Sequence, residues 1–161
     1  MQRSKGFTLV ELIAVLVITG IIASIAAPRF IGVDAFDARG SYSTLVSALR
    51  YAQKTAIAQR TTVCADVNTS TKLVVLTYRS SSSADCSAVT VGAVIDPATQ
   101  LAYSKTLSKN VIITASTNPL GFDGLGRPVP NAAATFTVKN AVDSTESLRT
   151  ITVEAETGYV R

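Results

Sequence analysis

The stretch that decides the fold is KGFTLVELIAVLVITGIIASIAAP, residues 5–28. Its part from residue 7 to residue 27 is apolar apart from one ionisable side chain, Glu11. A helix rises about 1.5 Å per residue, so a helix of this length crosses the hydrocarbon core of a bilayer, which is about 30 Å thick. We therefore expect residues 7–27 to form a single transmembrane segment.

Two basic residues, Arg3 and Lys5, precede this run and should hold its first end in the cytoplasm. Three interpretations compete: a plain anchor, a cleaved secretory signal, and a short leader ahead of a retained helix. A secretory signal has a shorter apolar region, roughly 7 to 15 residues, before small residues such as Ser24-Ile25-Ala26. A plain anchor leaves Glu11 unexplained unless it snorkels to the headgroups, because a charge at the centre of a membrane helix costs roughly 2.5 to 3.5 kcal/mol.

Four elements of the amino-terminal stretch occur together: a basic leader ending in glycine, a phenylalanine after it, a glutamate at the fifth position from the cut, and a proline at the end of the apolar run. They lie in Lys5-Gly6-Phe7-Thr8-Leu9-Val10-Glu11-Leu12 and at Pro28. This combination resembles the start of type IV pilins and type II secretion pseudopilins. It favours the third interpretation, with residues 1–6 as a prepilin leader peptide.

The resemblance implies that a prepilin peptidase cleaves between Gly6 and Phe7 and N-methylates Phe7. The new amine is cationic near neutral pH, and its attraction to a carboxylate is stronger in a helical bundle of low dielectric than in water. Glu11 would then pair with this amine and act in assembly. Pro28 removes a backbone donor and clashes with the preceding turn, so we expect a helix kink there.

A second helical pattern follows the apolar run. Apolar positions spaced by four and three residues predict a buried seam, formed by Ala38, Tyr42, Leu45, Leu49, Ala52 and Ala56. We expect one long helix from about Phe7 to Gln59, within a segment 7–60. Its first half meets lipid or other subunits, and its amphipathic second half packs beneath a head.

Residues 61–161 change to short β-rich runs separated by loop signals. The expected strands are Thr61–Val67, Leu73–Arg79, Val89–Ile95, Val111–Ala115, Ala134–Lys139 and Thr150–Glu154. We read residues 118–131 as a loop. The fold class is therefore α+β and pilin-like, with a long N-terminal helix packed on an antiparallel β-sheet head.

Composition excludes several kinds of chemistry. The chain has no His and two Cys, so a His/Cys metal site lacks ligands and a catalytic Cys lacks its usual base. We expect no enzyme activity, metal or cofactor. Cys64 and Cys86 favour a disulfide over free thiols if the head is periplasmic.

The carboxy-terminal half carries two further segments, Gly121-Phe122-Asp123-Gly124-Leu125-Gly126-Arg127-Pro128 and Ile151 to Arg161, with its Thr157-Gly158-Tyr159-Val160 ending. They resemble the GspH/FimT group of H-type pseudopilins and minor pilins, and especially a minor pilin of the mannose-sensitive haemagglutinin type. Ordinary hairpin chemistry would account for the glycines equally well.

The leading hypothesis is a minor pilin or pseudopilin that initiates, caps or joins a type IV pilus or a type II secretion pseudopilus. Its expected partners are other subunits, the prepilin peptidase, a membrane platform protein, an assembly ATPase and inner-membrane lipid. It would be a single-pass inner-membrane protein with a periplasmic head before it enters the filament. The alternative is a filament-tip module for DNA, a glycan or a secreted protein, with a basic binding face formed by Arg127, Lys139, Arg149 and Arg161.

Overall fold

The structure is a computed structural model that describes residues 7–30, 33–80, 85–142 and 147–161. Contacts divide the chain into two compact units, with the boundary between Val33 and Asp34. The first unit holds helix α1 (Leu9–Phe30), and the second holds almost all of helix α2 (Val33–Gln59) together with every strand. The two units are described in turn.

Helix α1 begins two residues later than expected and continues past Pro28 to Phe30. Residues 31 and 32 lie outside the described residues, so the single helix over Phe7–Gln59 and the kink at Pro28 stay predictions. The window Leu9–Ala26 is long and apolar enough to span a membrane, and none of its residues is buried. This agrees with the expected membrane segment in length and composition.

Helix α2 buries the face that its sequence predicts. Five of the six seam residues are buried, namely Ala38, Leu45, Leu49, Ala52 and Ala56, and Tyr42 is half-buried. Ala48 adds a further buried position one turn before Ala52. The prediction of an amphipathic helix is therefore confirmed, and the small alanine side chains let the strands approach the helix closely.

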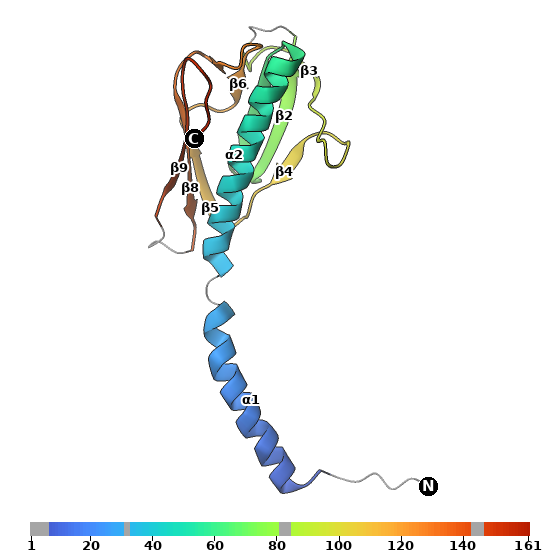
Figure 1. The fold of residues 1–161 in the computed structure, drawn as a ribbon, viewed down its shortest axis with the longest axis vertical. Helices are drawn as coiled ribbons and strands as arrows, with labels where there is room; N and C mark the ends of the chain where they lie inside the picture. The colour runs from blue at the N-terminus through green and yellow to red at the C-terminus, as the bar shows by residue number, and fades with distance from the viewer. Residues whose placement is uncertain (1–6, 31–32, 81–84, 143–146) are drawn as a thin grey trace, which may run out of the picture. The chain divides into compact units, whose positions relative to one another are not determined.

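The strands form two antiparallel sheets rather than the single sheet that we expected (Figure 1). The larger sheet has the order β3-β2-β1-β6-β7, and β4 pairs with β2 beside β3. Its strands are β1 (Val63–Asn68), β2 (Leu73–Arg79), β3 (Thr90–Ala93), β4 (Ser104–Thr106), β6 (Leu120–Phe122) and β7 (Pro128–Val129). The smaller sheet has the order β5-β8-β9, with β5 (Val111–Ala115), β8 (Ala134–Asn140) and β9 (Arg149–Val153).

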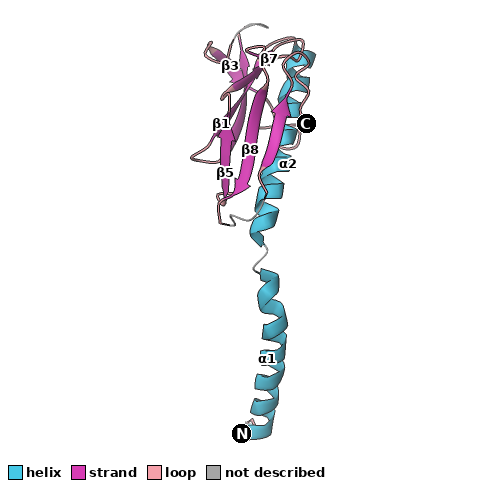
Figure 2. Cartoon of the chain, turned by 90° about the vertical axis from the view of Figure 1, so that its left-hand side faces the viewer, coloured by secondary structure: helices cyan, strands magenta, loops and turns pink. Residues whose placement is uncertain are grey.

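One hydrophobic core joins α2 to both sheets, which lie on the same side of the helix (Figure 2). Burial alternates along β8, where Ala134, Phe136, Val138 and Asn140 are buried and the residues between them are not. Such alternation is expected of an antiparallel sheet with one face on the core. The expected α+β architecture is confirmed.

The segment 118–131 corrects the sequence analysis, which read it as a loop. It contains β6 and β7, which pair through Gly121 with Val129 and Phe122 with Pro128. Strand β6 has three residues and β7 has two, and they contain glycine and proline, which normally mark turns. Pairing of β6 with β1 overrides that local preference, because it places Leu120 and Phe122 in the core.

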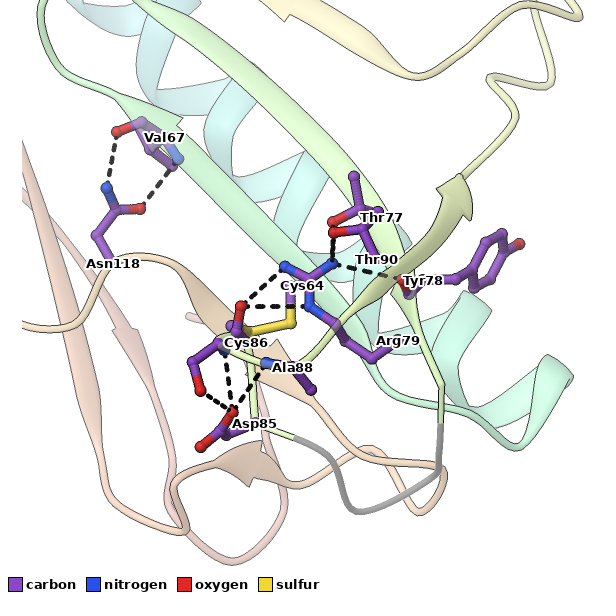
Figure 3. The surroundings of a disulfide bond; sticks show 11 residues. Cys64, Val67, Thr77, Tyr78, Arg79, Asp85, Cys86, Ala88, Thr90 and Asn118 are labelled. Carbon is purple, nitrogen blue, oxygen red and sulfur yellow. Dashed lines mark hydrogen bonds between the residues drawn. A yellow bond between two sulfur atoms is a disulfide. The ribbon is translucent and has the colours of Figure 1, made fainter.

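Cys64 in β1 and Cys86 after β2 form a disulfide, as the sequence favoured (Figure 3). The bridge closes a loop across a sequence separation of 22. Gly121 lies beside it in β6, and a Cβ atom built there would be 2.9 Å from Cys86 Sγ. The neighbouring strand must therefore carry glycine at this position for the bridge to fit.

The guanidinium of Arg79 fixes the segment that follows the bridge. It is buried and donates from Nε and Nη2 to the carbonyl oxygen of Cys86, at 3.3 Å and 3.0 Å. It also donates from Nη1 to the hydroxyls of Thr77 and Thr90. Figure 3 shows these bonds converging around the two cysteines. Arg79 thus joins the ends of β2 and β3 to the disulfide.

The disulfide predicts a measurable stability difference. Replacing both cysteines by serine should lower the free energy of unfolding by about 3 kcal/mol, because a loop of this size is no longer restricted in the unfolded chain. Urea unfolding of the full chain in detergent, followed by the β-sheet signal in circular dichroism, measures the difference. The parent chain under reducing conditions is the matched control and should unfold like the variant. Two freely alkylated thiols in the parent chain under oxidising conditions would contradict the bridge.

Candidate functional site

The description of the amino-terminal candidate site begins at Phe7, because Gly6 and the rest of the expected leader lie outside the described residues. Phe7 is exposed, and Glu11 lies in the first turn of α1, also exposed. The hydroxyl of Thr8 accepts a hydrogen bond from the backbone N–H of Glu11 at 3.3 Å. Thr8 is therefore the N-cap of α1, a role that the sequence analysis missed.

The spacing of Thr8 and Glu11 is that of a capping box, Ser or Thr followed three residues later by Glu. This pattern could have identified Thr8 from the sequence. A carboxylate in the first turn is also favoured by the positive end of the helix dipole. Glu11 therefore has a local reason to occupy this position, in addition to the pairing with an amino terminus that the resemblance implies.

From Leu9 to Ile25 the described surface of α1 is mostly apolar. Its exposed apolar side chains are Leu9, Val10, Leu12, Ile13, Val15, Leu16, Val17, Ile18, Ile21, Ile22 and Ile25. The hydroxyls of Thr19 and Ser24 donate to the carbonyl oxygens of Val15 and Ile21, so both hydroxyl groups have their hydrogen-bond acceptors within the helix. A helix of this kind is stable where lipid or other apolar helices cover it.

In the head, the turn between β6 and β7 is built around Asp123. One oxygen of its buried carboxylate accepts from the backbone N–H groups of Leu125 and Arg127, at 2.9 Å and 2.8 Å. The other oxygen accepts from Arg127 Nε and forms an ion pair with Nη2 at 2.9 Å. Gly126 follows with a φ of 86°, a conformation that favours glycine.

Helix α2 joins this turn to the end of the chain. Gln53 donates from Nε2 to the carbonyl oxygens of Gly126 and Thr157, at 3.0 Å and 2.9 Å. A Cβ atom at Gly158 would be 1.9 Å from the carbonyl oxygen of Gly126, so the two segments touch through their backbones. The two carboxy-terminal segments that resemble the GspH/FimT group are thus adjacent in space, and Gln53 is a residue that the sequence analysis did not single out.

Arg50, one turn earlier on α2, holds the last residues. Its Nε and Nη2 donate to the carbonyl oxygen of Val160 at 3.3 Å and 2.9 Å. Arg161 and Thr152 exchange backbone hydrogen bonds beside it, at 2.8 Å and 3.0 Å. The chain end is therefore fixed to both α2 and β9.

The four cations of the predicted basic face have separate surroundings. Arg127 pairs with Asp123, and Arg161 pairs with Glu154 at 3.1 Å. Arg149 is opposite Val138 in the ladder of β8 and β9, whereas Lys139 is the next residue along β8. Successive residues of a strand point to opposite faces, so Lys139 and Arg149 project from different faces of the smaller sheet. The binding face stays a prediction, and the described contacts give two of its members other roles.

The part of the chain that the structure describes contains no group of three or more His, Cys, Asp or Glu side chains that could hold a metal ion. A cleft of about 720 Å³ lies between α2 and the part of the chain from Asp96 to Lys105, which joins β3 to β4 and enters β4. It is lined by residues of both elements, among them Tyr42, Arg50, Tyr51, Lys54, Tyr103 and Lys105.

The amino-terminal stretch and the head each match a described family. Residues 1–27 match the prokaryotic N-terminal methylation motif, and residues 42–157 match the family described as type II transport protein GspH. The chain is also 41% identical over 58 residues to the type IV major pilin protein PilA of Myxococcus xanthus, and 40% identical over 58 residues to the narrow pilus major component PilA5 of Thermus thermophilus. Each match covers 36% of this chain, 26% of the first relative and 50% of the second. The chain therefore matches at most half the length of these relatives.

Two solved structures share the fold. The minor pilin FimU of Pseudomonas aeruginosa gives a TM-score of 0.56 at 16% identity, covering 76% of this chain and 85% of that one. The minor pseudopilin EpsH of Vibrio cholerae gives 0.59 at 12% identity, covering 78% of this chain and 94% of that one. Because the GspH family covers most of the chain, including α2 from Tyr42 onward and the strands, this protein belongs to the GspH family, with an N-terminal methylation motif ahead of its head.

Proposed function

We propose that this chain is a subunit of a type IV pilus or a type II secretion pseudopilus. The observation that carries the proposal is that two features occur in one chain. One is an exposed apolar helix that begins with a methylation motif, and the other is a head of the GspH family. A minor pilin and a minor pseudopilin share the fold of the head, so the proposal covers both kinds of filament.

Processing would begin at the leader. In this proposal a prepilin peptidase cuts between Gly6 and Phe7 on the cytoplasmic side and methylates Phe7. The amine that is released carries a positive charge in a medium of low dielectric, where attraction to a carboxylate is strong. Glu11 is the acceptor, and the cap at Thr8 keeps the first turn of α1 formed around it.

Assembly would then move the subunit from lipid to filament. The apolar surface of α1 is covered first by the inner membrane and afterwards by the corresponding helices of neighbouring subunits. Arg3 and Lys5 hold the leader in the cytoplasm, which places the head and its disulfide in the periplasm. A platform protein and a cytoplasmic ATPase supply the work of extraction.

The role of the head in this proposal is structural. Its buried carboxylates serve local structure: Asp123 holds a turn, and Asp96 pairs with Lys105. The hydrogen bond from Lys105 keeps the pKa of Asp96 below its ordinary value. The proposal therefore assigns the head no catalytic step.

The leader predicts the mass of the mature chain. Mass spectrometry of protein isolated from native membranes or filaments should find an amino terminus at methylated Phe7. Co-expression with an inactive prepilin peptidase is the control and should leave the chain starting at Met1. A native chain that begins at Met1 or that is cut near Ala26 would overturn the proposed processing.

The proposed role of Glu11 predicts that removing its charge impairs assembly and leaves processing unchanged. Glu11→Gln keeps the length of the side chain and removes its charge. An ion pair at about 4 Å in an effective dielectric of about 20 is worth about 4 kcal/mol, so incorporation into filaments should fall at least about tenfold. Immunoblots of sheared filaments against membranes measure it.

Two further variants separate the charge from the helix cap. Thr8→Ala removes the cap and leaves the carboxylate, so it should be incorporated better than Glu11→Gln. Glu11→Asp keeps the charge and should retain part of the incorporation. If Glu11→Gln is processed and incorporated like the parent chain, the carboxylate acts only in the start of the helix and the assembly role is wrong.

A further inference from the structure

The cleft beside α2 is formed by an interruption in the edge of the larger sheet. Strands β3 and β4 pair with successive halves of β2, and the chain between them leaves the edge and returns at a bridge between Ile95 and Ala102. This loop is tied to α2, because the hydroxyl of Tyr51 donates to the carbonyl oxygen of Ile95 at 2.8 Å. The tyrosine rings of Tyr51 and Tyr103 stack with their centroids 5.4 Å apart. The walls of the cleft are therefore fixed from both sides.

A second hollow continues the cleft along α2. It has a volume of about 510 Å³, shares Tyr51 and Lys54 with the first, and reaches Gln59. The two together follow α2 from Tyr42 to Gln59, about 25 Å at the rise of a helix. An extended segment of about seven or eight residues has this length.

The edge of β4 beside the cleft has unpaired backbone groups. Among the described strands, β4 pairs with β2 alone. The N–H groups of Tyr103 and Leu107 donate within the chain, to the carbonyl oxygens of Val94 and Lys72. The N–H groups of successive residues in a strand point to opposite edges. The N–H groups of Ser104 and Thr106 therefore point away from β2. An added strand could pair with them, which is a common mode of peptide recognition.

The cleft is lined by more cationic side chains than carboxylates. Lys105 is neutralised by Asp96. The guanidinium of Arg50 is held at the chain end by the carbonyl oxygen of Val160, whereas Lys54 is exposed and forms no ion pair with the residues that the structure describes. Tyr42 and Val46 lie about three and about two turns before Lys54 on the same helix. One end of the cleft is thus cationic and the other apolar and aromatic.

We propose that this cleft binds an extended segment of a separate protein that carries carboxylates at one end and apolar side chains at the other. Its backbone adds to the edge of β4, its carboxylates meet Lys54, and its apolar side chains meet Val46 and Tyr42. Tyrosine, which lines the cleft at three positions, is enriched in protein interfaces. The proposal goes beyond the assembly role of α1 and does not depend on it.

Among the described residues, a second copy of this chain offers the cleft no free pair of carboxylates with the spacing of a strand. The sequence has one pair of carboxylates two residues apart, Glu154 and Glu156. They lie in a turn that is closed by a hydrogen bond from the N–H of Gly158 to the carbonyl oxygen of Glu154. Glu154 is paired with Arg161, and Glu156 accepts from Asn131 at 3.3 Å. We therefore commit to a segment of another protein as the occupant.

The proposal is tested with the full chain in detergent micelles and a fluorescein-labelled peptide, Glu-Ser-Glu-Ser-Leu-Ser-Leu, together with the peptide of reversed order. In a strand, alternate residues face the same side, so this pattern presents two carboxylates and then two leucines to the cleft. Fluorescence anisotropy should show saturable binding by one of the two orders. The affinity should fall at least about tenfold for the same peptide with Gln in place of Glu, and it should fall with added salt.

Two charge-reversal variants locate the site. Lys54→Glu should weaken binding of the acidic peptide at least about tenfold, whereas Lys109→Glu, an exposed cation away from the cleft, should bind like the parent chain. Circular dichroism verifies that both variants are folded. The proposal is overturned if neither peptide order binds, if the Gln peptide binds equally well, or if both variants lose affinity alike. It is also overturned if a single-stranded oligothymidylate competes for the cleft with higher affinity, or if Lys54→Glu abolishes self-association of the chain in sedimentation.

Discussion

The contact between the buried face of α2 and the two sheets holds the head together. Each sheet is open, and each directs one apolar face toward the same helix. Full burial of a leucine side chain such as Leu45 or Leu49 contributes about 1.5 to 3 kcal/mol, and the neighbouring alanines keep the helix close enough for both sheets to reach it. Without α2 the smaller and larger sheets would have no shared core.

The polar flanks of the same helix determine where the loops of the head lie. On one flank, Gln53 and Arg50 hold the Gly126 turn and the chain end. On the other flank, Tyr51 holds the loop between β3 and β4. Because these bonds all start from one rigid element, the carboxy-terminal segments and the cleft are positioned relative to each other through α2.

Periodicity alone was enough to predict α2, its buried face and the strands at Leu73–Arg79 and Val111–Ala115. It could not reveal β6 and β7, because Gly121 and Pro128 carry turn signals and only pairing with β1 makes the segment extended. The division into two sheets depends on pairings between residues far apart in sequence. The hydrogen bonds of Gln53 and the buried position of Arg79 also arise from long-range contacts, so no local sequence pattern predicts them.

The start of α1 shows how a carboxylate can be kept in an apolar helix before it has a partner. A charge at the centre of a membrane helix costs roughly 2.5 to 3.5 kcal/mol, and the cost falls toward the end. A carboxylate in the first turn recovers about 0.3 to 1 kcal/mol from the helix dipole. Capping by Thr8 keeps that turn formed. The helix start therefore offsets part of the cost of Glu11. In the proposed assembly the remainder is recovered by pairing with the free amine of a neighbour, which would make a neighbouring subunit a better surrounding for this helix than lipid.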